Sequence, residues 1–200
     1  VQDRAGGLSM LDRDPPDHTR LRGLVRKVFT PRAIGALEPR VTELVDTALD
    51  GLAADGGGDL VEALAFPLPF AVITDMLGMP PTDPARLREL TGPVVRSLEP
   101  NADADLARRI SEADRELCAL TAEAIEWKRA NPGDDLMTSI VNAEVDGHRL
   151  TDEEIGAFLI LLASAGHDTT MHSTTDAMQA LVDNPDQRAW LMEDFEDGNR

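Results

Sequence analysis

The chain has 200 residues, the size of one domain, of which 42% are hydrophobic and 28% charged. This composition excludes a disordered protein, and the longest uninterrupted apolar run, at positions 157–163, is too short to cross a bilayer. The single cysteine, Cys118, excludes an intrachain disulfide and a cysteine-rich zinc module, and the net charge of −18 disfavours nucleic acid or an anionic membrane as the main partner. We therefore expect a globular cytoplasmic protein.

The predicted elements are helices almost throughout, and their boundaries are marked by proline, glycine or a capping side chain. Asp14, followed by two prolines, begins the first helix, and Thr30-Pro31 begins the second, which ends at three glycines. Thr151 and Glu154 form a capping box at the start of a long last helix. The expected helices span residues 14–29, 30–55, 70–77, 84–98, 102–130, 134–141 and 151–183, and Asp146-Gly147 is a turn that predicts at most a small hairpin.

The last helix changes character in its middle. Residues 158–163 are apolar on every face, so we expect this helix to run through the middle of the protein. The segment A-G-H-D-T-T at 165–170 then brings together a glycine, an acid and two threonines, which are poor formers of a buried helix. Threonine hydroxyls can bond back to the helix carbonyls and bend it. This cluster predicts a functional site; the alternative is a kink packed against a neighbouring helix, with Asp168 facing water.

A basic window stands out from the acidic chain. Positions 13–40 hold seven basic and three acidic residues, a local charge of +4. Within it, His18 and Arg22 are four residues apart and project from one face of the first helix. An imidazole and a guanidinium together suit a carboxylate or a phosphate. The alternative is a solvated row of charges that pair with Asp14 or Asp17.

A metal site is a minor alternative. His167-Asp168 is the dipeptide found in helical metal-dependent phosphohydrolases, and Asp168 and His172 are spaced to share a metal ion. His167 and His172, however, are about 140° apart on a helix, and the chain has no H-x-x-x-H or H-E-x-x-H. Cys118 lies between leucines in a predicted helix, where we expect a small core residue.

Three segments together resemble bacterial cytochrome P450 monooxygenases. D-P-P-D-H-T-R-L-R at 14–22, with F-T-P at 29–31, resembles the C-helix segment of that family. A-G-H-D-T-T at 165–170 resembles the I-helix motif A-G-x-[DE]-T-T, and N-P-D-Q-R at 184–188 resembles the H-P-D-Q-R that follows it. Order and spacing match over essentially the whole chain. The resemblance implies an all-α fold, the middle portion of the cytochrome P450 fold with a long central I-helix.

The same resemblance implies a haem-dependent monooxygenase that hydroxylates a small apolar organic substrate with dioxygen and two electrons. His18 and Arg22 would hold a haem propionate. A ferredoxin or flavoprotein electron donor would dock near Arg20, Arg26 and Lys27, in the basic window.

The I-helix motif carries the roles implied for the chemistry. Ala165 and Gly166 would leave the space in which dioxygen binds over the haem. Asp168 and Thr169 would pass protons during dioxygen activation, which requires an acid and a hydroxyl in a dry cavity. His167 occupies the variable position of the motif, and the sequence does not orient it.

The chain departs from the family pattern in one respect. A haem-thiolate enzyme needs a cysteine ligand in F-x-x-G-x-x-x-C-x-G and an E-x-x-R pair before it, and neither occurs among these 200 residues. Cys118 precedes the oxygen-activation motif and lies in a different context. We therefore expect residues 1–200 to be a single partial domain, without the N-terminal part and the cysteine loop, and inactive alone. The alternative is a non-catalytic helical binding module or a degenerate gene product on this scaffold.

Overall fold

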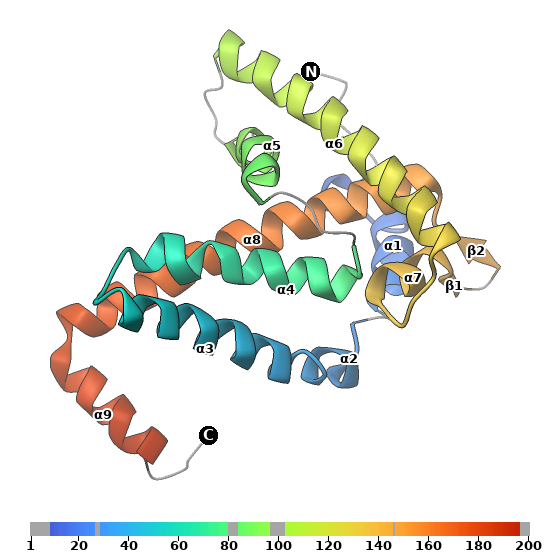
Figure 1. Cartoon of the computed structure of the whole chain (residues 1–200). Helices are drawn as coiled ribbons and strands as arrows, with labels where there is room; N and C mark the ends of the chain where they lie inside the picture. The colour runs from blue at the N-terminus through green and yellow to red at the C-terminus, as the bar shows by residue number, and fades with distance from the viewer. Residues whose placement is uncertain (1–8, 27–28, 80–83, 97–102, 146, 197–200) are drawn as a thin grey trace.

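The computed structural model describes residues 9–26, 29–79, 84–96, 103–145 and 147–196 (Figure 1). In these ranges the chain is helical nearly throughout, which confirms the predicted all-α class. The helical elements are η1 (Met10–Asp12), α1 (Asp17–Arg26), α2 (Pro31–Gly35), α3 (Glu38–Ala54), the π-helical turn η2 (Val61–Ala65), α4 (Pro67–Leu77), α5 (Pro84–Arg96), α6 (Ala104–Ala130), α7 (Leu136–Val141), α8 (Asp152–Asp183) and α9 (Pro185–Glu196).

A small antiparallel hairpin precedes α8. Strand β1 (Glu144–Val145) pairs with β2 (His148–Arg149), with Glu144 opposite Arg149. Gly147 in the turn has a φ of 77°, a conformation that favours glycine. The turn dipeptide thus does form the small hairpin that it indicated.

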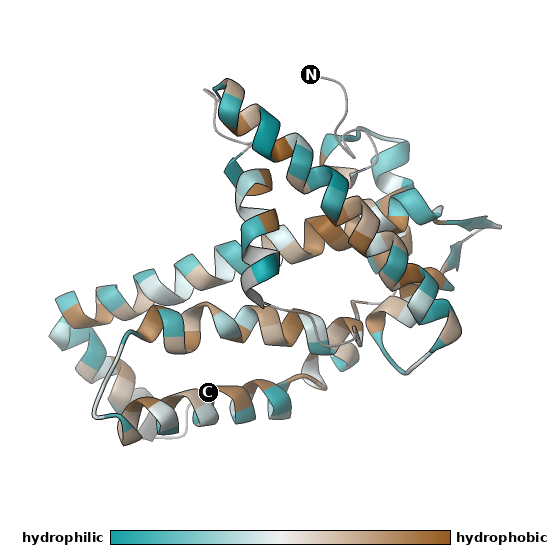
Figure 2. Ribbon diagram, turned by 45° about the horizontal axis from the view of Figure 1, so that its top comes forward, coloured by the Kyte–Doolittle hydropathy of each residue, from teal (hydrophilic) through white to brown (hydrophobic). Residues whose placement is uncertain are grey.

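The central element is α8, 32 residues long, which packs against α4, α5, α6 and η2 (Figure 1). It begins in the predicted capping box: the Thr151 hydroxyl accepts from the Glu154 N–H at 3.2 Å, and the Glu154 carboxylate accepts from the Thr151 N–H at 2.9 Å. Residues 155–160 are buried, whereas most of the second half of α8 is exposed. Figure 2 shows the same division, with hydrophobic residues concentrated in the first half. The predicted course through the core is therefore confirmed for that half.

Three helix boundaries differ from the sequence-based expectation, and α9 was not among the expected helices. α1 begins at Asp17, after the two prolines that were expected in its first turn. The second predicted helix is divided into α2 and α3, because Pro39 has no N–H and its ring would collide with the preceding turn of a continuous helix. In contrast, α4 begins at Pro67 rather than at Phe70. Pro67 and Pro69 fit there because the first-turn N–H groups of a helix lack intrahelical partners anyway.

The main core joins α1, α4, α6, α7 and α8. Its most deeply buried side chains have 0–2% of their surface exposed and are Leu24, Leu77, Ile125, Met137, Ile140 and Ile155. Cys118 does not belong to the core, contrary to expectation: it is exposed on α6. The buried stripe of α6 runs through Leu117, and the next residue lies about 100° further round the helix. Among the described residues, no helix combines the length and apolarity needed to span a membrane.

Candidate functional site

The A-G-H-D-T-T segment lies in the middle of α8, which continues through it as a helix. The Thr169 hydroxyl donates to the Ala165 carbonyl at 2.5 Å, and the Thr170 hydroxyl donates to the Gly166 carbonyl at 2.7 Å. This is the backbone bonding that the sequence predicted for the threonines. Because the Thr169 proton is engaged in this way, its oxygen is left as a hydrogen-bond acceptor for a group placed above it.

Gly166 allows α8 to approach α4 closely. A Cβ atom at this position would lie 3.1 Å from Cδ1 of Ile73, which is closer than ordinary van der Waals contact. The absence of a side chain here therefore has a packing reason, independent of any ligand. A role for Gly166 beside dioxygen stays a prediction. Ala165 is exposed on another side of the helix.

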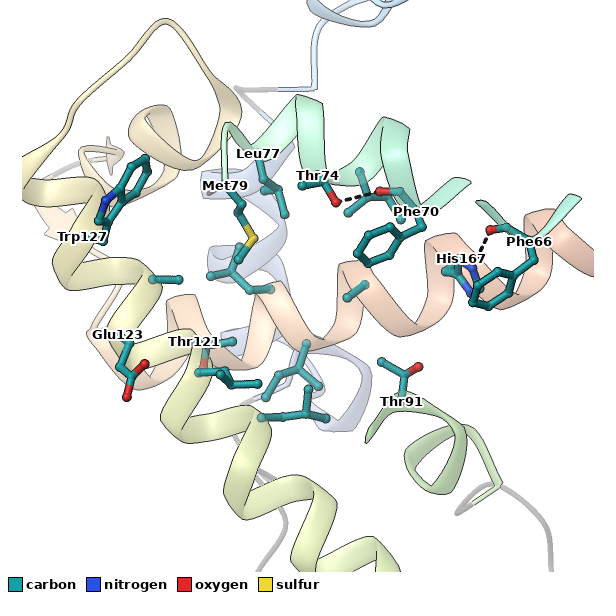
Figure 3. A pocket seen from close by; sticks show the side chains of 17 residues that line it. Phe66, Phe70, Thr74, Leu77, Met79, Thr91, Thr121, Glu123, Trp127 and His167 are labelled. Carbon is teal, nitrogen blue, oxygen red and sulfur yellow. Dashed lines mark hydrogen bonds between the residues drawn. The ribbon is translucent and has the colours of Figure 1, made fainter. Parts of the chain in front are cut away.

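His167 points to the buried side of α8 and contacts the start of α4 (Figure 3). Its Nε2 is 2.9 Å from the carbonyl oxygen of Phe66, and its ring meets the rings of Phe66 and Phe70 edge-on, with centroids 4.8 and 6.4 Å away. Its Nδ1 is 3.0 Å from Oδ1 of Asp168. The half-buried acid of the motif thus has a partner, the histidine next to it.

The predicted anion-binding pair lies on α1. His18 is half-buried and Arg22 is exposed. Asp17, one of the acids considered as a partner for this row, is 3.1 Å from Arg13 instead. The arrangement leaves His18 and Arg22 on one helix face, as their spacing predicted.

α1 is fixed against the first turns of α8. The Phe29 ring, which follows α1, meets the Phe158 ring edge-on with centroids 6.2 Å apart. Arg20 forms an ion pair with Glu154 in the capping box. Asp168 lies ten residues beyond Phe158, about 15 Å along the helix.

The Arg20–Glu154 ion pair involves one of the three residues expected to contact the electron donor. The charge of Arg20 is engaged within the chain, and the neighbouring carboxylate and Asp17 raise the pKa of its guanidinium, although burial opposes this. Burial alone would raise the pKa of Glu154, but hydrogen bonds from Arg20 and the Thr151 N–H, together with nearby positive charge, hold it below the ordinary value. Arg26 is exposed, and Lys27 lies outside the described residues.

The residues present are compatible with a group that has an apolar face and carries carboxylates. Ala165 and Thr169 are four residues apart and exposed, and they form a small-sided strip on α8. Beside them, the hydroxyl of Ser164 is buried and finds no hydrogen-bond partner within the described part of the chain. His18 and Arg22 on α1 can donate hydrogen bonds to a carboxylate. The metal alternative gains no support, since the described residues hold no group of three possible ligands.

A cavity of about 410 Å³ lies on the other side of α8, between α4, α5 and α6 (Figure 3). On α8 it is lined by Leu159, Ile160, Ala163 and His167, which share the side opposite Ala165. Sequence reasoning did not find this cavity, because four helices distant in the chain enclose it.

Comparison with known proteins places these features in a family. No protein-family model matches the sequence. Cytochrome P450 107B1 of Saccharopolyspora erythraea is 40% identical over 188 residues, which cover 94% of this chain and 45% of that protein. The cytochrome P450 monooxygenase PikC of Streptomyces venezuelae is 41% identical over 190 residues, or 94% of this chain and 44% of PikC.

Comparison with solved structures indicates the same family. The Mycobacterium marinum cytochrome P450 CYP268A2, determined in complex with pseudoionone, matches 96% of this chain with a TM-score of 0.81 and 37% identity. This match covers 47% of that structure, so the chain spans less than half the length of each of these three relatives. The sequence, the helix order and the two motifs agree with one another, and the chain belongs with the cytochrome P450s.

Proposed function

We propose that this chain forms the distal side of the haem site in a cytochrome P450 monooxygenase. The observation that carries the proposal is the arrangement on α8. A partly exposed acid, Asp168, is held by a buried histidine and precedes Thr169, whose hydroxyl oxygen can accept a hydrogen bond. The exposed strip of Ala165 and Thr169 leaves room for a ligand beside that acid.

Each group in the proposed site has a definite task. His18 and Arg22 bind a propionate of the haem through charge-assisted hydrogen bonds. The bound haem supplies the redox iron that activates dioxygen. Asp168 binds and releases protons at its carboxyl oxygen. The Thr169 oxygen accepts a hydrogen bond from the group that receives the proton and so orients that group.

The substrate in this proposal is a small apolar organic molecule, which the site hydroxylates with two electrons from a ferredoxin or flavoprotein. In this proposal the thiolate ligand of the haem lies outside these 200 residues, because Cys118 is their single cysteine and does not stand in the family's cysteine motif. The 200 residues alone should therefore bind no thiolate-ligated haem.

The test uses the protein that carries this chain, purified with haem. Its reduced form with carbon monoxide should give the absorption band of a thiolate-ligated haem. Thr169→Ala should keep that band but raise peroxide release and lower product per electron consumed. Thr175→Ala is a matched control, because its hydroxyl also donates to a helix carbonyl, that of Met171, in the same helix. A protein without the band would support the non-catalytic alternative, and unchanged coupling would remove Thr169 from the site.

The propionate pair has its own test. Replacing His18 and Arg22 together by Gln and Leu should reduce haem retention at low haem concentration, because the propionate would lose its charged donors. Arg13 pairs with Asp17 at the start of α1, and replacing Arg13 should leave haem retention unchanged. Equal retention in both variants would contradict the assignment.

A further inference from the structure

His167 sits behind the proposed proton-delivery site and is not one of the residues assigned to it. Its side chain is 8% exposed, against 23% for the Asp168 side chain to which it is bonded. We propose that His167 is a positioning residue, which fixes the Asp168 carboxyl from Nδ1 while Nε2 anchors the imidazole to the Phe66 carbonyl. This inference rests on the proposed monooxygenase function and assigns a task to the variable position of the motif.

The two hydrogen-bond partners of His167 restrict where its protons lie. The Phe66 carbonyl can only accept, so Nε2 of His167 carries a hydrogen. The Nδ1–Oδ1 contact of 3.0 Å is a hydrogen bond of ordinary length, and it holds one further hydrogen, on the imidazole or on the carboxyl of Asp168. In both cases the histidine determines which way the carboxyl group faces. The second carboxyl oxygen, Oδ2, takes no part in this bond.

The surroundings make the imidazole a rigid support. Phe66 and Phe70 meet its ring edge-on, with interplanar angles of 83° and 81°. The anchoring carbonyl belongs to Phe66, at the junction of η2 and α4, and Gly166 lets α4 approach α8 closely enough for the bond to form. Asp168 is thus oriented from the protein interior, before any ligand binds. Such preorganisation reduces the cost of placing a proton donor.

Three substitutions separate the two hydrogen bonds. The amide nitrogen of Asn lies near the position of Nδ1, so His167→Asn keeps a donor for Asp168 and loses the anchor to Phe66. The amide nitrogen of Gln lies near Nε2, so His167→Gln keeps the anchor and loses the bond to Asp168. His167→Phe keeps an aromatic ring against Phe66 and Phe70 but loses both bonds. His148→Phe, at an exposed histidine of β2, is the control.

The experiment measures product formed per electron consumed in the haem-loaded protein that carries this chain, together with crystal structures and melting temperatures of each variant. We expect His167→Gln and His167→Phe to lower coupling about tenfold or more, because a mispositioned acid loses much of the usual 10²–10⁴ contribution of proton transfer. His167→Asn should retain most of the coupling despite a lower melting temperature. In the crystal structures, the Asp168 carboxyl should turn away in the Gln and Phe variants only.

The outcomes distinguish the inference from the function on which it rests. Coupling that follows the melting temperature, with Gln better than Asn, would show a merely structural histidine and overturn the inference. In an Asp168→Asn background, His167→Phe should cause no further loss of coupling, and an additive loss would also overturn it. A wild-type protein that binds haem but oxidises no substrate would instead overturn the proposed function, while an unmoved Asp168 in the Phe variant would overturn the positioning role by itself.

Discussion

Lys128 and Asp135 form a buried ion pair, with Nζ 2.7 Å from Oδ2 and side-chain exposures of 3% and 12%. The same ammonium group donates to the carbonyl oxygen of Gly78 at 2.7 Å. Asp135 in turn caps α7 by accepting from the Thr138 N–H at 2.8 Å. One lysine thus ties together the ends of α4 and α6 and the start of α7, on the side of the core where α8 begins.

Removing this lysine should be costly. Lys128→Met leaves the Asp135 carboxylate buried without its cation, and we expect a loss of about 3–5 kcal/mol in the free energy of unfolding. Urea unfolding of the protein that carries this chain measures this loss. Arg129→Met is the matched control, since its partner Asp152 is 55% exposed and such pairs contribute only about 0–1 kcal/mol. Equal losses in the two variants would show that burial of the Lys128 pair has no energetic consequence.

Gly78 should tolerate no side chain. Its φ is 59°, and a Cβ atom would lie 2.6 Å from Oδ2 of Asp135. Gly78→Ala should therefore lose about 1–2 kcal/mol for the left-handed backbone alone, and more through displacement of Asp135. Gly51→Ala, in α3 with open space around its Cβ, should instead gain about 0.5–1 kcal/mol. A neutral Gly78→Ala variant would contradict the observed close approach.

The Arg20–Glu154 pair should make stability depend on acid pH. Because the pKa of Glu154 is below its ordinary value of 4.5, its contribution is fully present above that value and is lost as pH falls through the folded-state pKa. Glu154→Gln should therefore be destabilised relative to wild type at neutral pH, and the difference should shrink below about pH 4.5. Unfolding free energies measured across this range test it. Glu153→Gln, at the exposed neighbouring position, should stay within about 0.5 kcal/mol of wild type. A difference that is constant with pH would exclude Glu154 as the titrating group.

Arg26 should affect electron delivery. It is an exposed cation in the basic window, and Arg20 is already paired with Glu154. Arg26→Glu should slow reduction by an acidic donor severalfold at low salt, and the effect should fade near 0.15 M salt, where charges are screened beyond about 8 Å. Substrate affinity should not change. Stopped-flow reduction measures the rate, with Arg109→Glu on α6 as the control. Equal rates for the two variants at low salt would place the donor elsewhere.

The positions of helices follow from local chemistry that the sequence displays. The capping box at Thr151 and the expected helix ends at residues 77 and 183 are boundaries that the structure confirms. The two threonine hydroxyls of the motif bond to carbonyls four residues back, as helical spacing allows. Short-range interactions decide these features, so a single sequence is enough to predict them. The basis for the family resemblance is of the same kind, since both motifs are contiguous.

Only the tertiary structure decided what each helix faces. Helical periodicity places side chains around one axis, but the side that meets another helix depends on contacts between distant parts of the chain. His167 is 101 residues from its anchor Phe66, and Arg20 is 134 residues from Glu154. Cys118 was predicted to be buried and is exposed for the same reason: its own helix does not reveal where α8 lies. The amino-acid sequence alone therefore determined most of the helices and the motifs, while the packing of α4 and α1 against α8 determined that His167 is anchored to Phe66 and that Arg20 pairs with Glu154.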